Sequence, residues 1–389
     1  MRREYFSALF LILLLSACDI ARAQNTQATP IPQRPPAQTT SQTQARPAAG
    51  FDLSEYGVRI QPEPRLIIMM AALDAAGFDP TPKGAEASAF RAQVRRDQMN
   101  LDEDLRKRLS NFYRTNKLPG DATPAEQAAR YVSLAYALGP TPGLEAPARS
   151  IDLPSGLLDV LDFAPLVREF YAKSGMMERL PGYMRLYLSE VERLRVPTTE
   201  MVRSTLSYLH TRPVTTTIER IPVKSQTTGN KKNEPPRYTT REHDRRFYIV
   251  PDLLAAPGTI NFRVIGDDYY TVVPYDTNPA SSELRRAYLQ YIADPLIARF
   301  NRDIAERRDA LKQLLDVVAK PGKTVSPDVF YATARSLVAA ADARLSEAAR
   351  LDALSRETQA RLAGAKDAAA RDAIIKEAQA ARAAIADEA

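Results

Sequence analysis

Residues 260–298 read INFRVIGDDYYTVVPYDTNPASSELRRAYLQYIADPLIA. The first half alternates around Gly266-Asp267, a pair typical of a two-residue hairpin turn. The second half opens on Asn278-Pro279, which predicts a helix cap followed by a proline at the first helical position. Apolar residues then recur at helical spacing. The stretch therefore predicts a hairpin over 260–265 and 269–273, followed by a helix that packs on it.

The periodicity on either side of this stretch sets the expected fold class. Upstream, a short alternating segment at 56–61 precedes a series of amphipathic patterns typical of helices, and the helical period returns after residue 300. From Val214 the period becomes alternating, and β-branched residues are frequent at 214–224 and again at 245–250. We expect these strands to join the hairpin in one small sheet. The prediction is a mainly helical α+β fold with a small, largely antiparallel sheet. The upstream helices are expected at 64–76, 87–117 (one helix or a pair), 124–138, 155–174, 183–195 and 199–211.

The N-terminus has the layout of a secretory signal, with Arg2-Arg3 followed by an apolar run and then small residues. Two processing sites remain open. The sequence LSAC ending at Cys18 resembles a lipoprotein box in which this cysteine would be lipidated, whereas ARA ending at Ala23 resembles an ordinary cleavage site. Residues 24–50 contain almost no large apolar side chain and are predicted to be a disordered tether. We expect export to the periplasm or cell envelope, with membrane retention if Cys18 is acylated.

Four segments follow from these patterns: a signal peptide at 1–23, the tether at 24–50, an α+β domain at 51–320 and a C-terminal helical region at 321–389. The last segment is rich in alanine and charge, so its helices are expected to be poorly anchored.

Composition argues against several function classes. The net charge of +6 comes from scattered arginines without interleaved aromatic residues, so no nucleic-acid partner is expected. Only two histidines are present, and the single cysteine is Cys18, so a three-histidine zinc site cannot be built and no disulfide is expected. We expect neither a metal nor another cofactor.

The central helix resembles a known motif. A hairpin, a short loop and a helix whose end reads YIADPL at 291–296 resemble the active-site helix of zincin-type metallopeptidases. The similarity is greatest to uncharacterised envelope families whose helix carries H-E-x-x-H, and it covers roughly residues 55–320. Counted back from Pro295, the three motif positions are Arg286, Ala287 and Gln290. None of these side chains can bind zinc or activate water as the motif does.

The resemblance implies a domain that has lost its catalytic ligands and survives as a binding or scaffolding module. Its former cleft would be lined by Arg285, Arg286, Gln290, Tyr288 and Tyr291, with a peptide or another protein as partner. No residue is assigned a catalytic role.

Two other interpretations remain. The protein could be a hydrolase with a non-metal site, in which Glu283 acts with neighbouring tyrosines, Tyr269, Tyr275 or Tyr288, near Arg285 and Arg286. Alternatively, the arginines are only the solvated face of an amphipathic helix.

Overall fold

The computed structural model describes residues 51–389, except for 151–152, 155, 223–237, 319–327 and 389. The predicted signal segment, Cys18 and the tether therefore lie outside the described residues. Contacts group the described residues in one unit. In the part that the structure describes, no helix is long and apolar enough to cross a membrane.

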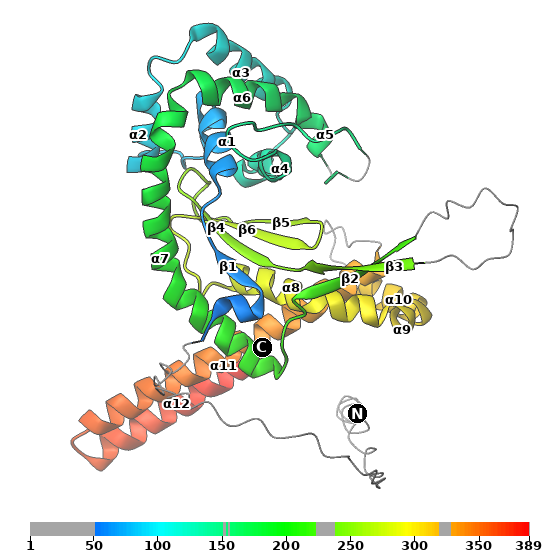
Figure 1. The fold of residues 1–389 in the computed structure, drawn as a ribbon. Coiled ribbons are helices and arrows are strands. Elements are labelled where there is room, and N and C mark those ends of the chain that lie inside the picture. Colours follow the sequence, from blue (N-terminus) through cyan, green and yellow to red (C-terminus); the bar gives the residue numbers. More distant parts are fainter. Residues whose placement is uncertain (1–50, 151–152, 155, 223–237, 319–327, 389) are drawn as a thin grey trace, which may run out of the picture. The chain divides into compact units, whose positions relative to one another are not determined.

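Helices dominate both ends of the described chain, and the strands lie between them (Figure 1). The elements before the sheet are η1 (Leu53–Tyr56), β1 (Val58–Ile60), α1 (Pro64–Ala75), α2 (Ala89–Asp97), α3 (Glu103–Thr115), α4 (Pro124–Ala137), α5 (Leu157–Val160), η2 (Leu161–Phe163), α6 (Ala164–Lys173) and α7 (Met176–Leu209). They are followed by β2 (Thr216–Pro222), β3 (Tyr238–Asp244), β4 (Phe247–Asp252), β5 (Asn261–Ile265), β6 (Asp268–Pro274), α8 (Ser282–Arg299), α9 (Asn301–Glu306), α10 (Arg308–Val318), α11 (Val329–Gly364) and α12 (Ala368–Glu388). The mainly helical α+β class is confirmed.

The predicted hairpin is confirmed. Strands β5 and β6 pair antiparallel, Ile265 lies opposite Asp268, and Gly266 supplies a φ of 61° at the turn.

The arrangement of the other strands differs from the prediction. The four-stranded sheet has the order β1-β4-β6-β5, and its β1-β4 and β4-β6 pairs are parallel. Strands β2 and β3 form a separate antiparallel ribbon. The β1-β4 pair joins segments far apart in the chain, and local periodicity carries no signal for such a contact.

Helices cover both faces of the four-stranded sheet. Val250 and Val272 on one face belong to the core formed with α1, α4 and the other N-terminal helices. Phe247 and Val273 on the opposite face belong to a second core that includes Leu284 of α8. Successive strand residues point to opposite faces, so one short strand serves both cores. Each large apolar side chain that is fully buried in this way contributes about 1.5–3 kcal/mol.

Helix α7 is a single element where the sequence predicted two helices. It continues through Pro181 and Pro197 and ends at His210, which has a left-handed φ of 49°. The buried stripe on α7 extends past the second proline, with Leu194 before it and Met201 after it. Continuous burial of this stripe offsets the roughly 3 kcal/mol that an internal proline costs.

Helix α8 begins three residues later than predicted. Its N-cap is Ser281, whereas Asn278 forms a turn in front of the helix. The Asn278 side chain accepts a hydrogen bond from the Ala280 amide at 3.0 Å, and its carbonyl accepts one from the Ser281 amide at 2.8 Å. Asparagine thus supplies an Asx turn here in place of the cap.

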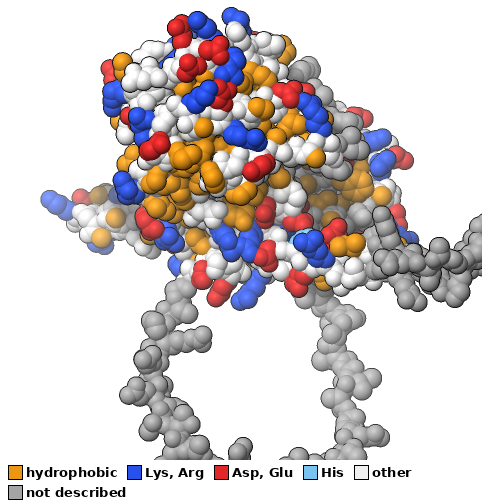
Figure 2. All heavy atoms as spheres, turned by 45° about the horizontal axis from the view of Figure 1, so that its top comes forward, with side chains coloured by type: hydrophobic (Ala, Val, Ile, Leu, Met, Phe, Trp, Pro, Cys, Tyr) orange, Lys and Arg blue, Asp and Glu red, His pale blue; other side chains and the backbone are white. Residues whose placement is uncertain are grey.

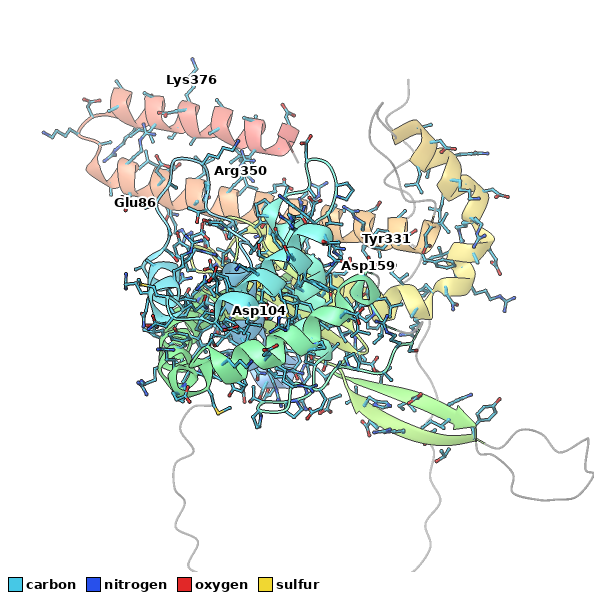
Figure 3. The ribbon with its side chains drawn as sticks, turned by 90° about the horizontal axis from the view of Figure 1, so that it is seen from above. Glu86, Asp104, Asp159, Tyr331, Arg350 and Lys376 are labelled. Atoms are coloured by element: carbon cyan, nitrogen blue, oxygen red, sulfur yellow. The ribbon has the colours of Figure 1, made fainter. Side chains whose placement is uncertain are left out.

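Charged groups are interspersed on the surface. Figure 2 shows lysine and arginine side chains mixed with aspartate and glutamate over the face that it presents. Figure 3, which views the molecule from above, shows that the β2-β3 ribbon stands away from the helices and that α12 lies alongside α11. The ribbon is mostly exposed on both faces, which distinguishes it from the buried sheet.

Candidate functional site: a groove between β5, α8 and α11

A groove with a volume of about 1030 Å³ lies between β5, α8 and α11. Its lining is mostly apolar and includes a few charged side chains. Figure 3 places Tyr331, one of the lining residues, near the N-terminal end of α11. The other lining residues are Ile260, Phe262, Val264, Glu283, Arg286, Ala287, Gln290, Asp294, Ile297, Ala298, Asn301, Phe330, Ala334, Arg335, Val338 and Ala339.

The chain directions of β5 and α8, which form two walls of the groove, follow from their contacts. Val264 lies opposite Tyr269 in the hairpin, and the Tyr269 hydroxyl donates a 2.5 Å hydrogen bond to the carboxylate of Asp294, late in α8. The other end of β6 leads through residues 275–281 to the start of α8. Helix α8 therefore runs antiparallel to β6 and in the same direction as β5. Four strand residues rise about 13 Å and eight helical residues about 12 Å, so Ile260 and Arg286 fall at the same end of the groove.

The three positions singled out by the metallopeptidase resemblance all line this groove. Arg286, Ala287 and Gln290 face it from α8, and Asp294 follows one turn later. The Gln290 amide donates a hydrogen bond to the Asp294 carboxylate. Among the described residues, no group of three or more histidine, cysteine, aspartate or glutamate side chains could hold a metal ion.

Tyr288 and Tyr291 lie elsewhere, which corrects their expected placement in a cleft. Both are fully buried and pack against Phe247, with ring centroids 5.3 and 5.7 Å away. The Tyr291 hydroxyl donates a 2.9 Å hydrogen bond to the Arg245 carbonyl, and burial raises the pKa of Tyr291 to about 12. Gly57 approaches the same hydroxyl so closely that a Cβ there would lie 2.1 Å from it. These tyrosines attach the helix to the sheet.

The two adjacent arginines have different environments. The Arg285 side chain is only 12% exposed, and it donates hydrogen bonds to Asp342 at 2.6 Å and to the Ser346 hydroxyl at 2.5 Å. The Arg286 side chain is 55% exposed, and its Nε donates a 2.7 Å hydrogen bond to the other oxygen of Asp342. Asp342 also accepts a hydrogen bond from Ser282. One buried carboxylate thus serves two guanidinium groups, and one positive charge remains in excess.

Strand β5 forms the outer edge of the sheet. No further strand pairs with it in the described parts of the chain. In a two-residue hairpin the residues that flank the turn form a hydrogen-bonded pair, so Ile265, Arg263 and Asn261 direct their backbone groups to β6. The backbone N–H and C=O groups of Phe262 and Val264 consequently point away from the sheet. The side chains of these same two residues line the groove.

Sequence reasoning missed the α11 wall. The α11 residues that line the groove recur at helical spacing, which is typical of ordinary packing: Tyr331, Ala334, Arg335 and Val338. The Arg335 guanidinium lies over the Tyr331 ring, 5.5 Å from its centroid. Nothing in the sequence connects Asp342 with the arginines more than fifty residues before it.

Of the residues named for the hydrolase alternative, Glu283 and Arg286 line the same groove, but the three tyrosines do not join them there. Glu283 is exposed at the groove, and it forms no hydrogen bond with a tyrosine among those described for this structure. Tyr288 is buried, the Tyr269 hydroxyl is bound to Asp294, and Tyr275 lines a different, smaller cavity next to Pro257.

No protein-family model matches this chain, and no curated protein or solved structure is significantly similar to it. The groove must therefore be interpreted from its own chemistry.

Proposed function

We propose that this chain is an exported, non-catalytic envelope protein whose groove binds an extended segment of another polypeptide. The observation that supports this most strongly is the edge of β5, where Phe262 and Val264 offer backbone groups beside a largely apolar groove. An added strand would pair with these groups, and its alternate side chains would enter the groove.

The metallopeptidase-like origin is part of the same proposal. Arg286, Ala287 and Gln290, which replace the metal-binding motif in the resemblance, all face the groove that a peptide would occupy. A cleft that keeps its walls after losing its ligands retains the capacity to bind a chain. The side chains now at the three motif positions cannot bind zinc as the motif does.

The expected affinity is moderate. Each backbone hydrogen bond contributes about 0.5–1.5 kcal/mol, so four of them provide at most roughly 6 kcal/mol before the cost of ordering the ligand. Apolar contacts with Phe262, Tyr331 and Val338 would have to supply the remainder. A dissociation constant on the order of micromolar corresponds to about 8 kcal/mol.

A single proline tests the strand pairing. A displayed library of random dodecapeptides is selected on the full-length chain, and the enriched peptides are then synthesised for binding measurements. Val264→Pro removes an outward N–H without removing a bond to β6, and it should weaken binding about tenfold. Val264→Ile keeps the N–H, the branched shape and the apolar groove surface, so it should bind as the parent chain does.

Thermal melts must show that both variants are folded. Unchanged binding by a folded Val264→Pro variant, or a selection that enriches no peptide, would refute strand addition at β5. No placement in the structure favours the alternative of a hydrolase centred on Glu283.

A further inference from the structure

We infer that the groove receives the free carboxyl end of a polypeptide, running antiparallel to β5, with its terminal carboxylate bound by Arg286. This inference rests on the proposed peptide-binding function and adds the polarity and the end group of the ligand.

The charge of Arg286 is available for a ligand. Asp342 is offset by Arg285, which is held by its own bonds to Asp342 and Ser346. Arg286 uses only its Nε for Asp342, and its terminal nitrogens form no hydrogen bond within the described chain. The Nε bond fixes the guanidinium plane, and the two terminal nitrogens, which bond to no described residue, form an edge whose two parallel N–H groups match a carboxylate.

The position of Arg286 sets the direction of the ligand. Arg286 and Ile260 lie at the end of the groove where β5 begins, and Asp294 and Val264 lie toward the other end. A strand whose carboxyl end is at Arg286 therefore runs opposite to β5. Antiparallel pairing would extend the β5-β6 hairpin in the pattern that is slightly more stable per residue.

The remaining charges in the groove agree with a chain that ends at this point. Glu283 lies one helical turn before Arg286 and would disfavour an acidic chain that continued past it. Among the described residues, Asp294 at the opposite end is bonded to the neutral donors Tyr269 and Gln290 and to no cation, so it would repel a carboxylate placed there. Arg335 is stacked on Tyr331 in the wall from α11. Of the two guanidinium groups that line the groove, that of Arg286 is the one whose plane is fixed by a bond to a described carboxylate, so the ligand carboxylate is placed there.

The test compares two forms of the same peptide. Random decapeptides are displayed with free carboxyl ends and selected on the full-length chain. Each enriched sequence is synthesised as the C-terminal acid and as the C-terminal amide, and binding is measured by fluorescence anisotropy. The acid should bind ten- to a hundredfold more tightly than the amide. Arg286→Gln should remove this difference by weakening the acid alone. Arg299→Gln on the same helix, outside the groove, should preserve it.

The outcomes separate the two proposals. Equal binding of acid and amide, with loss of both in Val264→Pro, would overturn the carboxylate inference and leave strand addition standing. An acid preference that persists in a folded Arg286→Gln chain would also overturn it. Peptides that bind equally to the parent chain and to Val264→Pro would contradict peptide binding at this groove altogether.

Discussion

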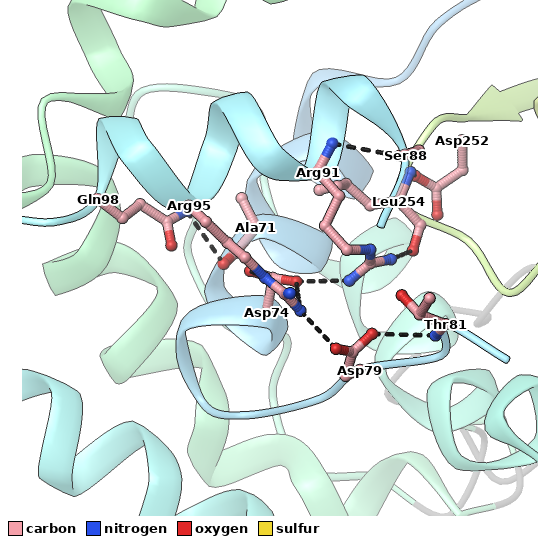
Figure 4. Close-up of polar contacts among 10 residues, drawn as sticks. All are labelled: Ala71, Asp74, Asp79, Thr81, Ser88, Arg91, Arg95, Gln98, Asp252 and Leu254. Carbon is pink, nitrogen blue, oxygen red and sulfur yellow. Dashed lines mark hydrogen bonds and ion pairs between the residues drawn. The ribbon is translucent and has the colours of Figure 1, made fainter. Parts of the chain in front are cut away.

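Two clusters of charged side chains in this chain have the same composition, one aspartate and two arginines. Their net charges differ, and this difference distinguishes a structural cluster from one that can bind a ligand. In each, one buried aspartate accepts hydrogen bonds from two arginines. Asp74 of α1 pairs with Arg91 and Arg95 of α2, as Figure 4 shows. Asp342 of α11 pairs with Arg285 and Arg286 of α8. Both carboxylates are 2% exposed, and in each cluster one arginine is largely buried and the other is more exposed.

The charge balance differs between them. Arg95 also pairs with Asp79 at 2.9 Å, so the first cluster holds two positive and two negative charges. Partial burial opposes the ionisation of Asp79, but hydrogen bonds from Thr81 and Arg95 lower its pKa to about 2. Arg286 has no second carboxylate among the described residues, and the second cluster keeps a net positive charge facing the groove. A cluster with no net charge can be buried between packed helices. A cluster with an excess positive charge beside a groove can bind an anionic ligand.

The largest predicted loss of stability comes from a substitution in the Asp74 cluster. Asp74→Ala leaves Arg91, with 4% of its side chain exposed, without a carboxylate, and should reduce the free energy of unfolding by about 3–5 kcal/mol. Asp342→Ala should cost less, about 1–3 kcal/mol, because Arg286 can turn to water and the more buried Arg285 keeps its hydrogen bond to the Ser346 hydroxyl. Urea denaturation measures both. Glu103→Ala, which breaks an exposed pair with Lys107, is the control and should change stability by less than about 0.5 kcal/mol. Equal losses at Asp74 and Asp342 would remove the distinction between the clusters.

A pH titration tests the neighbourhood of the balanced cluster. Asp252 lies beside Arg91 and Leu254 (Figure 4), and burial raises its pKa to about 6. One of its oxygens accepts hydrogen bonds from Tyr187 at 3.2 Å and from the Leu254 amide at 2.9 Å, while the other has no partner in the described structure.

The direction of the pH effect follows from the raised pKa. The folded state holds the Asp252 proton up to about pH 6, whereas the unfolded state loses it near pH 4, so stability falls as the pH rises from 4 to 6. A shift of about two pH units corresponds to about 3 kcal/mol. Asp252→Asn should remove this loss, and its advantage over the parent chain should grow between pH 4 and pH 6 in denaturation curves. A constant difference across this range would show that Asp252 does not titrate there.

The sequence predicted local features and missed long-range ones. Gly266-Asp267 predicted the hairpin because a turn is decided by a few neighbouring residues. Arg286 and Gln290 were predicted from their spacing on one helix, and both line the groove. The α11 wall and Asp342 were missed because their contacts with α8 are tertiary and leave no spacing signal.

Tyr288 and Tyr291 were misplaced for a related reason. A tyrosine at helical spacing fits either a cleft or a core, and only the position of the sheet decides between them. The same limit applies to the parallel β1-β4 pair, because nothing in the sequence of either strand indicates its partner.

The smallest predicted effect is the most informative about the second cluster. Arg286→Gln should reduce the free energy of unfolding by less than about 1 kcal/mol, because its side chain is 55% exposed and Asp342 keeps Arg285 and Ser282. Arg95→Gln should cost more, because Asp74 and Asp79 both lose a donor. Melting curves of the two variants provide the comparison. If Arg286→Gln is as destabilising as Arg95→Gln, the Arg286 charge is already used in holding α11 against α8. The guanidinium would then have no free edge for a carboxylate, and the two clusters would be structural in the same way.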